Sequence, residues 1–351
     1  MSFRPRASVN LPGITANWRA VDRLTPTATT AAVVKANGYG LGAPKVAHAL
    51  AEAGCSTFFV AHLEEGTEVR RALGFGPRIF VLNGPSGSDL RTFREADLTP
   101  VLSTDEQVEL WARAQRGACA LHFDTGMNRL GLSAKLLEHQ RDALQKLQPV
   151  LVMSHLACAD TPDHPLNRIQ LDRFREISVA FPDTPASLAA SAGCYLGKDY
   201  AFDLTRPGIA LYGGSIPPDS VRLEPAVTLE ARIVSVILAR AGDSVGYGAT
   251  HQLAENTTLA TVALGYADGI PRSGSNTLIG YINGTPCPVV GRISMDLITI
   301  DVSKAQGIAK AGVRVEFLGV HAKLEEQAAR AGTLGYELLT GLSNRVERVY
   351  P

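Results

Sequence analysis

Short apolar runs alternate with longer amphipathic segments eight times between residues 29 and 205. A short apolar run predicts a strand buried on both faces, and an amphipathic segment predicts a helix that covers it. Eight strand-then-helix units in about 190 residues match a (β/α)8 barrel near the lower end of its size range. A doubly wound open α/β sheet is the structural alternative.

The individual elements can be placed from these runs and from the residues that flank them. We expect strands at residues 31–34, 55–62, 78–82, 99–102, 118–123, 150–154, 187–190 and 202–205. We expect helices at residues 45–53, 63–73, 88–96, 104–117, 133–147 and 166–181. Thr104 with Gln107 forms a capping box, and Pro44 and Gly54 bracket the first helix of the set.

The pattern changes after the barrel. The stretch 213–219, GGSIPPD, has linker composition. Short β-rich runs follow, separated by Gly, Pro and Asn, and helical periodicity returns only at residues 322–330. The runs are residues 226–237, 259–263, 278–282, 288–290, 297–302 and 313–318. We predict an α/β chain with an N-terminal (β/α)8 TIM barrel of residues 10–220 and a C-terminal mainly-β domain of residues 221–351, which residues 1–9 join.

Composition restricts the class of function. The 351 residues exceed the usual single core, and 34 Lys and Arg balance 34 Asp and Glu, so we expect a small-molecule substrate and neither nucleic acid nor membrane as partner. The five cysteines are odd in number without a CxxC pair. The opening MSFRPRASVN lacks an apolar leader core, and no run of about 18 apolar residues occurs. We therefore expect a cytoplasmic protein.

The stretch AAVVKANGYGLG, residues 31–42, places a lysine at the end of the first strand. A partly desolvated Lys35 has a depressed pKa, and its free amine can form a Schiff base with an aldehyde. The glycines around Tyr39 let backbone approach a ligand closely. The structural alternative is a lysine whose stem packs on the strand end while its amine stays in water.

Four further groups of residues follow the other expected strands. Functional residues in a barrel sit at the carboxyl ends of its strands, so all of these converge on one mouth. Arg129 follows the fifth strand, and its planar fork suits a carboxylate or a phenolic oxygen. His155, Ser191 and Arg206 end the sixth, seventh and eighth. His155 with Cys158 and an aspartate is incomplete as a zinc site, so we predict no metal.

The motifs VVKANGYG, DTGMNRLG, SHLACAD, RPGIALYG, VGYGAT, ALGYADGIPR and GRISMD occur in this order along the chain. Together they resemble the alanine racemases, which carry pyridoxal 5'-phosphate on a lysine. The resemblance implies the same barrel and β domain, and a homodimer with shared active sites. It implies that Lys35 carries the cofactor and serves as the base on the D side, and that Tyr247 of the partner subunit is the base on the L side.

The remaining roles that the resemblance implies concern binding. Tyr39, Ser191, Gly208 and Ile209 would bind the cofactor phosphate, Arg206 its ring nitrogen, and His155 would support the arginine beside the ring. Arg129, Tyr266 and Met295 would contact the substrate, and Arg272, Arg292 and Asp296 would line the entrance. The chain departs from the family pattern at several positions, which are Gly38, Leu41, His122, Asn128, Ala190 and Asn344.

An arginine at the ring nitrogen keeps its proton, so it leaves that nitrogen unprotonated and weakens the ring as an electron sink. This favours racemisation of L- and D-alanine, with D-alanine supplied to peptidoglycan. The alternatives are a serine or broad-specificity racemase, an amino-acid decarboxylase on the same architecture, and a cofactor-carrying barrel protein without catalysis.

Overall fold

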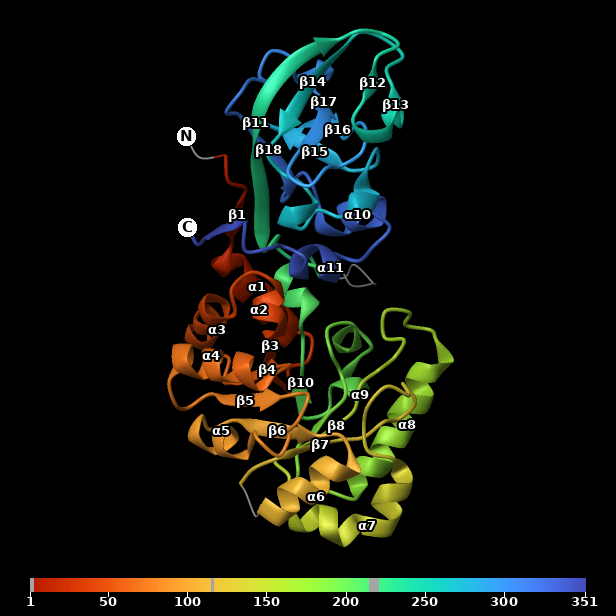
Figure 1. Ribbon diagram of the computed structural model, residues 1–351. Coiled ribbons are helices and arrows are strands. Elements are labelled where there is room, and N and C mark those ends of the chain that lie inside the picture. The colour runs from red at the N-terminus through yellow and green to blue at the C-terminus, as the bar shows by residue number, and fades with distance from the viewer. Residues whose placement is uncertain (1–2, 115–116, 215–220) are drawn as a thin grey trace.

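The chain folds into two parts joined along one side (Figure 1). The structure is a computed structural model that describes residues 3–114, 117–214 and 221–351. The red-to-green N-terminal part holds helices wrapped around short strands, and the green-to-blue C-terminal part is built mainly of strands (Figure 1). This confirms the predicted fold class of an α/β barrel followed by a mainly-β domain.

Seven parallel strands form the wall of the barrel, in the order β3-β4-β5-β6-β7-β8-β9. Their bounds are β3 Ala32–Val33, β4 Thr57–Val60, β5 Arg78–Val81, β6 Thr99–Leu102, β7 Ala120–His122, β8 Leu151–Met153 and β9 Ala186–Ser187. Spatial order equals chain order, which is the arrangement of a singly wound βα barrel and not of a doubly wound open sheet.

A parallel pair, β2 (Thr29–Thr30) and β10 (Leu204–Thr205), closes the wall. A bridge between Ala190 and Arg206 joins this pair to the β9 side, and the Val33 amide donates to the Pro207 carbonyl at 3.0 Å on the β3 side. If β2 and β3 are counted as one interrupted strand, the wall contains the eight strands of the predicted barrel.

Helices cover the outside of the wall, and several have the bounds that the amphipathic pattern predicts. They are α1 Leu11–Asp22, α3 Ala43–Glu52, α4 Leu63–Leu73, α5 Leu90–Glu95, α6 Asp105–Ala114, α7 Ala134–Lys146, α8 Pro165–Val179 and α9 Lys198–Ala201. α4 and β6 coincide with the predicted ranges. Residues 115–116 of the predicted helix 104–117 lie outside the described residues.

Helix α1 was not predicted. Its second and third residues are a proline and a glycine, which are typical of turns and loops. Pro12 is tolerated because the first turn needs no backbone donor there, and the Asn10 side chain accepts from the Gly13 amide at 2.9 Å. Its Trp18 indole donates to the Thr30 carbonyl at 3.1 Å, which fixes the helix on the wall beside the first barrel strand.

The C-terminal part is an eight-stranded sheet around the long strand β11 (Val227–Ala239). The path is β16-β15-β18-β11-β1-β19, with β14 paired to β11 and to β17. The other bounds are β1 Arg6–Val9, β12 Ser244–Val245, β13 His251–Gln252, β14 Thr257–Val262, β15 Ile279–Ile282, β16 Thr285–Pro288, β17 Ile298–Asp301, β18 Arg314–Leu318, β19 Glu347–Val349, α10 Leu324–Arg330 and α11 Gly335–Thr340.

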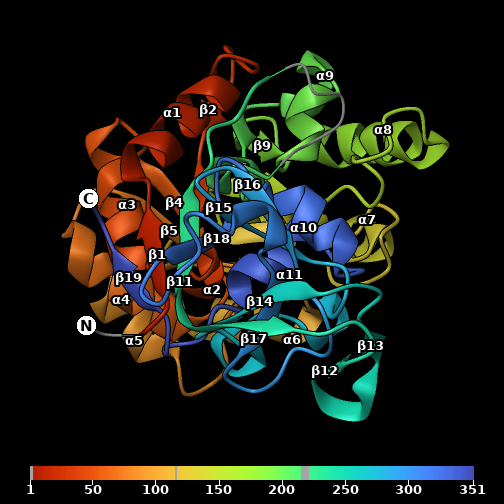
Figure 2. The ribbon, with the colours of Figure 1, turned by 90° about the horizontal axis from the view of Figure 1, so that it is seen from above.

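The two ends of the chain meet in this sheet. β1 pairs antiparallel with β11 and parallel with β19, so both termini lie on the same side of the molecule (Figures 1 and 2). This pairing supports placing residues 3–9 with the β domain, whereas residues 1–2 of the predicted range 1–9 lie outside the described residues. Residues 215–219 of the predicted linker lie outside the described residues, and the domain bounds stay a prediction.

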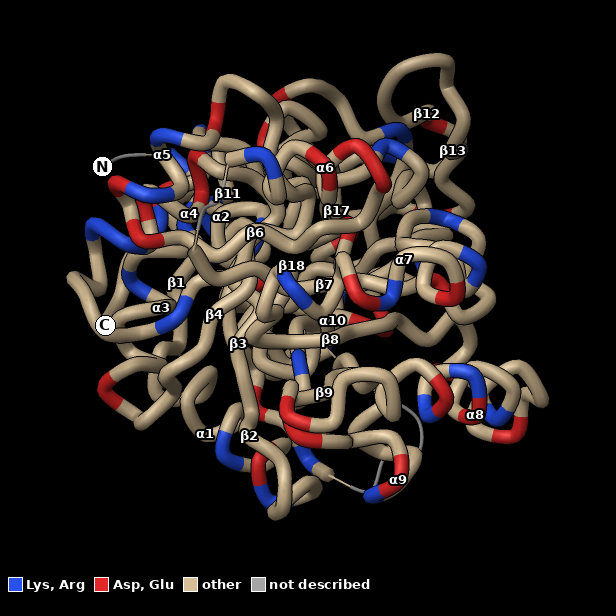
Figure 3. Tube along the Cα trace, turned by 90° about the horizontal axis from the view of Figure 1, so that it is seen from below, with Lys and Arg blue, Asp and Glu red and all other residues tan. Residues whose placement is uncertain are grey.

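Positively and negatively charged residues are interspersed along the trace (Figure 3). No helix in the described part of the chain is long and apolar enough to cross a membrane. Seven short segments complete the element list of the described residues: α2 Lys35–Tyr39, η1 Ala192–Tyr195, η2 Ile209–Tyr212, η3 Tyr247–Ala249, η4 Tyr266–Asp268, η5 Arg272–Gly274 and η6 Ser303–Ala305. Several of them carry residues of the predicted site.

Candidate active site

Lys35 stands where the first barrel strand ends, and it opens α2 (Lys35–Tyr39), a segment of 5 residues. Inside α2 the backbone is left-handed, with φ of 52° at Ala36, 54° at Asn37 and 53° at Tyr39. Each L-residue in this conformation costs about 1–2 kcal/mol. Contacts from outside the turn must therefore hold it in place.

The end of the β domain packs directly on this turn. A Cβ at Gly40 would collide with the Leu339 carbonyl, so only glycine fits there. Arg348 donates to the Gly40 carbonyl at 3.0 Å, and the Tyr350 hydroxyl donates to the Leu41 carbonyl at 3.0 Å. The C-terminal segment therefore fixes the position of the lysine turn.

The half-buried Lys35 amine is poised for nucleophilic chemistry. Burial lowers the pKa of Lys35 below its ordinary value, the Arg129 guanidinium lowers it further, and the Glu65 carboxylate opposes them. A lowered pKa raises the fraction of free amine, which is the form that attacks a carbonyl carbon. The environment thus agrees with the predicted Schiff-base role.

Two short helices begin side by side at the same mouth, η1 after Ser191 and η2 after Gly208. The Ser191 hydroxyl oxygen accepts from the Gly208 amide at 2.8 Å and from the Ala210 amide at 3.3 Å. Ile209 opens η2, and the first amides of a helix have no acceptor within it. Such converging donors form a cradle for an anion, and the phosphate position was predicted here.

Tyr39 reaches into this cradle. A Cβ at Gly208 would collide with the Tyr39 hydroxyl, so the hydroxyl lies against the glycine backbone. The Tyr39 ring stacks on Tyr212 at a centroid distance of 4.5 Å, and the Tyr212 hydroxyl donates to the Val33 carbonyl at 3.1 Å. Burial raises the pKa of Tyr39 well above its usual range, so its phenol stays protonated and can donate.

Arg206 is buried behind the cradle, with 4% of its surface exposed. Its guanidinium donates to the Ser187 hydroxyl and, at 2.6 Å, to the Ser154 carbonyl. Burial lowers the pKa of Arg206 to about 10, which leaves it charged at neutral pH. A buried guanidinium held by neutral oxygens keeps its proton.

Two histidines lie among these cations. Burial, with Arg206 and Arg129 nearby, lowers the pKa of His155 to about 3. The same three causes lower the pKa of His122 to about 4, with Asp124 opposing, and the Ser103 hydroxyl lies 3.2 Å from the His122 Nδ1 atom. Both imidazoles are therefore neutral at pH 7 and can accept hydrogen bonds from arginine.

The loop that carries Arg129 is shaped by its first residue. The Asp124 carboxylate accepts from the amides of Gly126 and Met127, each at 2.8 Å. A Cβ at Gly131 would collide with the Asp124 backbone, so glycine is required where the loop returns. The loop is thereby folded back on itself, while the Arg129 side chain remains exposed and within electrostatic reach of Lys35.

The predicted site residues of the β domain lie elsewhere in this single chain. Tyr247 is 72% exposed, Met295 53% and Tyr266 42%. Tyr247 opens η3 beside the β12–β13 hairpin, at the end of the β domain far from the barrel (Figure 1). In this chain the predicted site residues at the barrel mouth therefore lie together, whereas these three residues of the β domain face solvent.

The predicted entrance residues, Arg272, Arg292 and Asp296, also lie on the β domain. A Cβ at Gly248 would come within 2.7 Å of the Arg292 guanidinium, which places this cation beside the Tyr247 turn. Asp296 accepts from Arg345 at 2.6 Å, and Arg272 opens η5. These residues are exposed or half-buried on the β domain.

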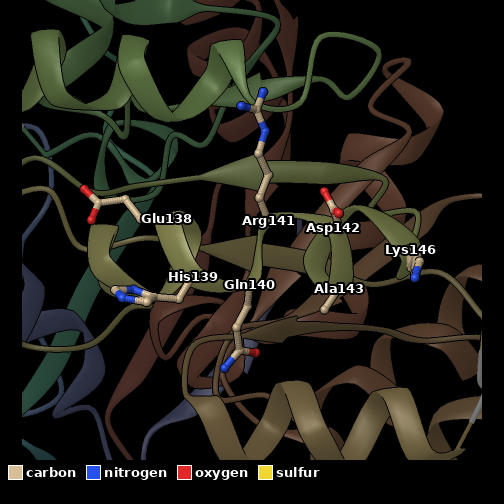
Figure 4. A pocket seen from close by; sticks show the side chains of 7 residues that line it. All are labelled: Glu138, His139, Gln140, Arg141, Asp142, Ala143 and Lys146. Carbon is tan, nitrogen blue, oxygen red and sulfur yellow. The ribbon is translucent and has the colours of Figure 1, made fainter.

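A separate hollow is lined by residues of α7, and none of the predicted site residues lies in it. Figure 4 shows its seven lining side chains, all from this one helix, pointing in different directions around it. In the described part of the chain, no group of three or more His, Cys, Asp or Glu side chains is placed to hold a metal ion. The barrel mouth is the candidate active site.

Comparison with known proteins decides the family. The alanine racemase N-terminal domain model matches residues 9–216, and the alanine racemase C-terminal domain model matches residues 226–350. The chain belongs to the alanine racemase family. An alanine racemase from Rhizobium meliloti is 45% identical over 100% of this chain and 97% of that protein. A biosynthetic alanine racemase from Agrobacterium fabrum is 44% identical over 98% of this chain and 93% of that protein.

Solved structures agree with this family assignment. A crystal structure of alanine racemase from Bartonella henselae with covalently bound pyridoxal phosphate superimposes with a TM-score of 0.93 at 35% identity, and covers 99% of each chain. This alanine racemase family member therefore shares the architecture of its relatives over its full length.

One residue at the mouth of this family member escaped the sequence analysis. Glu65 accepts hydrogen bonds from the amides of Ala36, Ala61 and His62. Its position three residues after the N-cap of the expected helix 63–73 was a visible signal, because a glutamate there often forms a capping box. Its contact with the lysine turn was not predictable from that spacing.

Proposed function

We propose that the chain is a pyridoxal 5'-phosphate-dependent isomerase that interconverts L-alanine and D-alanine. Beyond the family assignment, the observation that carries the proposal is Arg206, a buried guanidinium held by hydroxyl and carbonyl oxygens. An arginine at the cofactor's ring nitrogen limits the delocalisation that transaminases and decarboxylases rely on, where a carboxylate usually stands. This favours return of a proton to the same carbon.

The groups at the barrel mouth suit this cofactor, which is an aldehyde with a phosphate arm and a phenolic oxygen. Lys35 offers a partly free amine to the aldehyde. Ser191, Gly208, Ile209 and Tyr39 surround a cradle of donors suited to the phosphate. When bound, the cofactor acts as an electron sink that acidifies the α-hydrogen of an attached amino acid.

Inversion of Cα requires a proton to leave one face and arrive on the other, so two bases are needed. We assign the Lys35 Nζ atom to the D side, where its lowered pKa lets it take a proton. We assign the Tyr247 Oη atom of the partner subunit to the L side. The Arg292 guanidinium beside the Tyr247 turn supports this assignment, because it can donate a hydrogen bond to a phenolic oxygen.

The remaining assignments concern binding of the substrate. Arg129 binds the substrate carboxylate, and neutral His155 lies close enough to both arginines to support their placement. Tyr266 and Met295 line the substrate side, and Arg272, Arg292 and Asp296 form the entrance. Asn344 stands where the family often carries a tyrosine, so serine remains the alternative substrate to test.

We propose a homodimer in which the β domain of each chain covers the barrel mouth of the other. Large apolar side chains exposed on the β domain support this interface: Leu238 is 68% exposed, Ile237 57% and Tyr247 72%. Residues 10–220 form the barrel domain, and residues 221–351 with residues 1–9 form the β domain. The protein supplies D-alanine for peptidoglycan in the cytoplasm.

The test combines a spectrum with a chiral assay on purified protein. We expect a visible absorbance band from the cofactor on Lys35, and equal amounts of D- and L-alanine after incubation with L-alanine, with slower change of L-serine and L-lysine. Lys35→Ala removes both the band and the turnover. Carbon dioxide release without a D-enantiomer would instead establish the decarboxylase, and a band without turnover the carrier protein.

A further inference from the structure

The left-handed turn after Lys35 needs external support, and its own contacts supply only part of it. The Asn37 side chain accepts from the Ala43 amide at 2.9 Å, and the Gly40 amide donates to the Ala36 carbonyl at 2.8 Å. These contacts lie on the C-terminal side of the turn. The N-terminal side begins at the amide of Ala36, the peptide bond that Lys35 itself forms.

Glu65 takes that amide. One carboxylate oxygen of Glu65 accepts from the Ala36 amide at 2.7 Å, and the other accepts from the Ala61 amide at 2.8 Å and the His62 amide at 3.2 Å. The carboxylate therefore links the turn after the first barrel strand to the start of α4 after the second. Charge-assisted bonds of this kind are about twice as strong as neutral ones.

The same carboxylate faces the Lys35 amine. Three charged or titratable groups act on that amine: Glu65 from α4, Arg129 from the loop after β7, and His155 from the end of β8. Arg129 is positive and His155 is neutral at pH 7, so Glu65 supplies the negative charge among the three.

We propose that Glu65 is a positioning residue for the catalytic lysine, which holds the strained turn after Lys35 and sets the charge that the Lys35 amine faces. The inference rests on the proposed function of Lys35. This role differs from that of an ordinary capping residue. A capping residue would stabilise the start of α4 but would not affect the Lys35 amine.

The chain offers a matched control. Glu64 lies in the same first turn of α4 and is exposed, whereas Glu65 is half-buried against the lysine turn. Glu64→Gln and Glu65→Gln remove the same charge one residue apart. The measurement is the rate at which full-length protein freed of cofactor takes up pyridoxal phosphate, followed by absorbance as a function of pH.

Uptake requires the free amine, so its pH profile reports the pKa of Lys35. Removing the facing carboxylate should shift the profile of Glu65→Gln by about one unit toward lower pH. The profile of Glu64→Gln should match that of the wild type. An unshifted Glu65→Gln profile, or an equal shift in both variants, would overturn the proposal.

A second variant separates the two parts of the role and covers the case in which Glu65→Gln fails to fold. Glu65→Asp keeps the charge but shortens the side chain, so it should release bound cofactor several-fold faster while its uptake profile stays near that of the wild type. Unchanged release would overturn the positioning role. If wild-type protein takes up no cofactor on Lys35, the proposed function itself fails, which is a distinct result.

Discussion

At the scale of single residues, the barrel mouth gathers positive charge and keeps its histidines neutral. His122 is an example, because burial and the neighbouring arginines lower its pKa from 6.5 to about 4 and so disfavour its protonated form. Its neutral imidazole lies 3.2 Å from the Ser103 hydroxyl and within electrostatic reach of Arg129. The neutral imidazole is therefore available as a hydrogen-bond acceptor at one of the positions where the chain departs from the family pattern.

A pH-dependent stability follows from the pKa of His122. Between pH 6.5 and about pH 4 the His122 side chain binds a proton in the unfolded chain but not in the folded chain. The contribution of His122 to the free energy of unfolding is therefore fully present above pH 6.5 and is lost as the pH falls through this range. The loss is about 1.4 kcal/mol per pH unit in that window. In urea unfolding from pH 7 to pH 4.5, the free energy of unfolding should fall less steeply with pH for His122→Gln than for the wild type.

The exposed His139 on α7 provides the control, because His139→Gln should retain the wild-type slope. Equal slopes for His122→Gln and wild type would mean that the His122 imidazole is protonated in the folded protein.

At the scale of elements, the lysine turn is clamped between two parts of the chain. Glu65 holds it from α4, and Arg348 and Tyr350 hold it from the C-terminal segment. Arg348 also donates to the Leu342 carbonyl at 2.6 Å and the Ser343 carbonyl at 2.6 Å, so it fixes the clamp itself. The β domain therefore supports the turn after Lys35 of its own chain.

Tyr350→Phe tests this clamp with the loss of one hydroxyl. It removes the 3.0 Å bond to the Leu41 carbonyl, which is worth about 1 kcal/mol. We expect a matching loss of stability in urea and a faster release of cofactor into a trap. Tyr281→Phe is the control, since that ring contacts His321 in the β domain. Identical release from both variants would show that the C-terminal segment does not restrain the turn.

The sequence predicted these elements unevenly, for physical reasons. α4 and the barrel strands follow from hydrophobic periodicity, which is a local signal. The left-handed turn does not, because Ala36 and Tyr39 disfavour positive φ locally and adopt it with support from Glu65 and the C-terminal segment. Strand ends located Lys35, His155 and Arg206 correctly at one mouth, since barrel geometry makes those ends converge.

At the scale of the whole molecule, the two halves of the predicted site lie on different parts of one chain. Periodicity and motifs cannot bring Tyr247 to Lys35, because in the proposed homodimer that contact depends on a second subunit. The exposed Tyr247, Tyr266 and Met295 are the residues that a partner's barrel would cover. An experiment in solution can test whether the two chains of the proposed homodimer share their active sites.

Mixing two inactive variants tests sharing directly. Lys35→Ala and Tyr247→Phe each disable both sites of their own dimer. After subunit exchange, half of the dimers are hybrids with one intact site of two, so activity should return to about one quarter of wild type. Sites built from a single chain would give no recovery, because each chain in the mixture carries a lesion.

The most direct measurement of the two-base assignment is hydrogen exchange at Cα in deuterated water with Tyr247→Phe. Lys35 still serves the D side, so D-alanine should exchange its α-hydrogen without racemising, while L-alanine should neither exchange nor invert at a comparable rate. Equal exchange of both enantiomers, or racemisation at the wild-type rate, would contradict the assignment of Tyr247 to the L side.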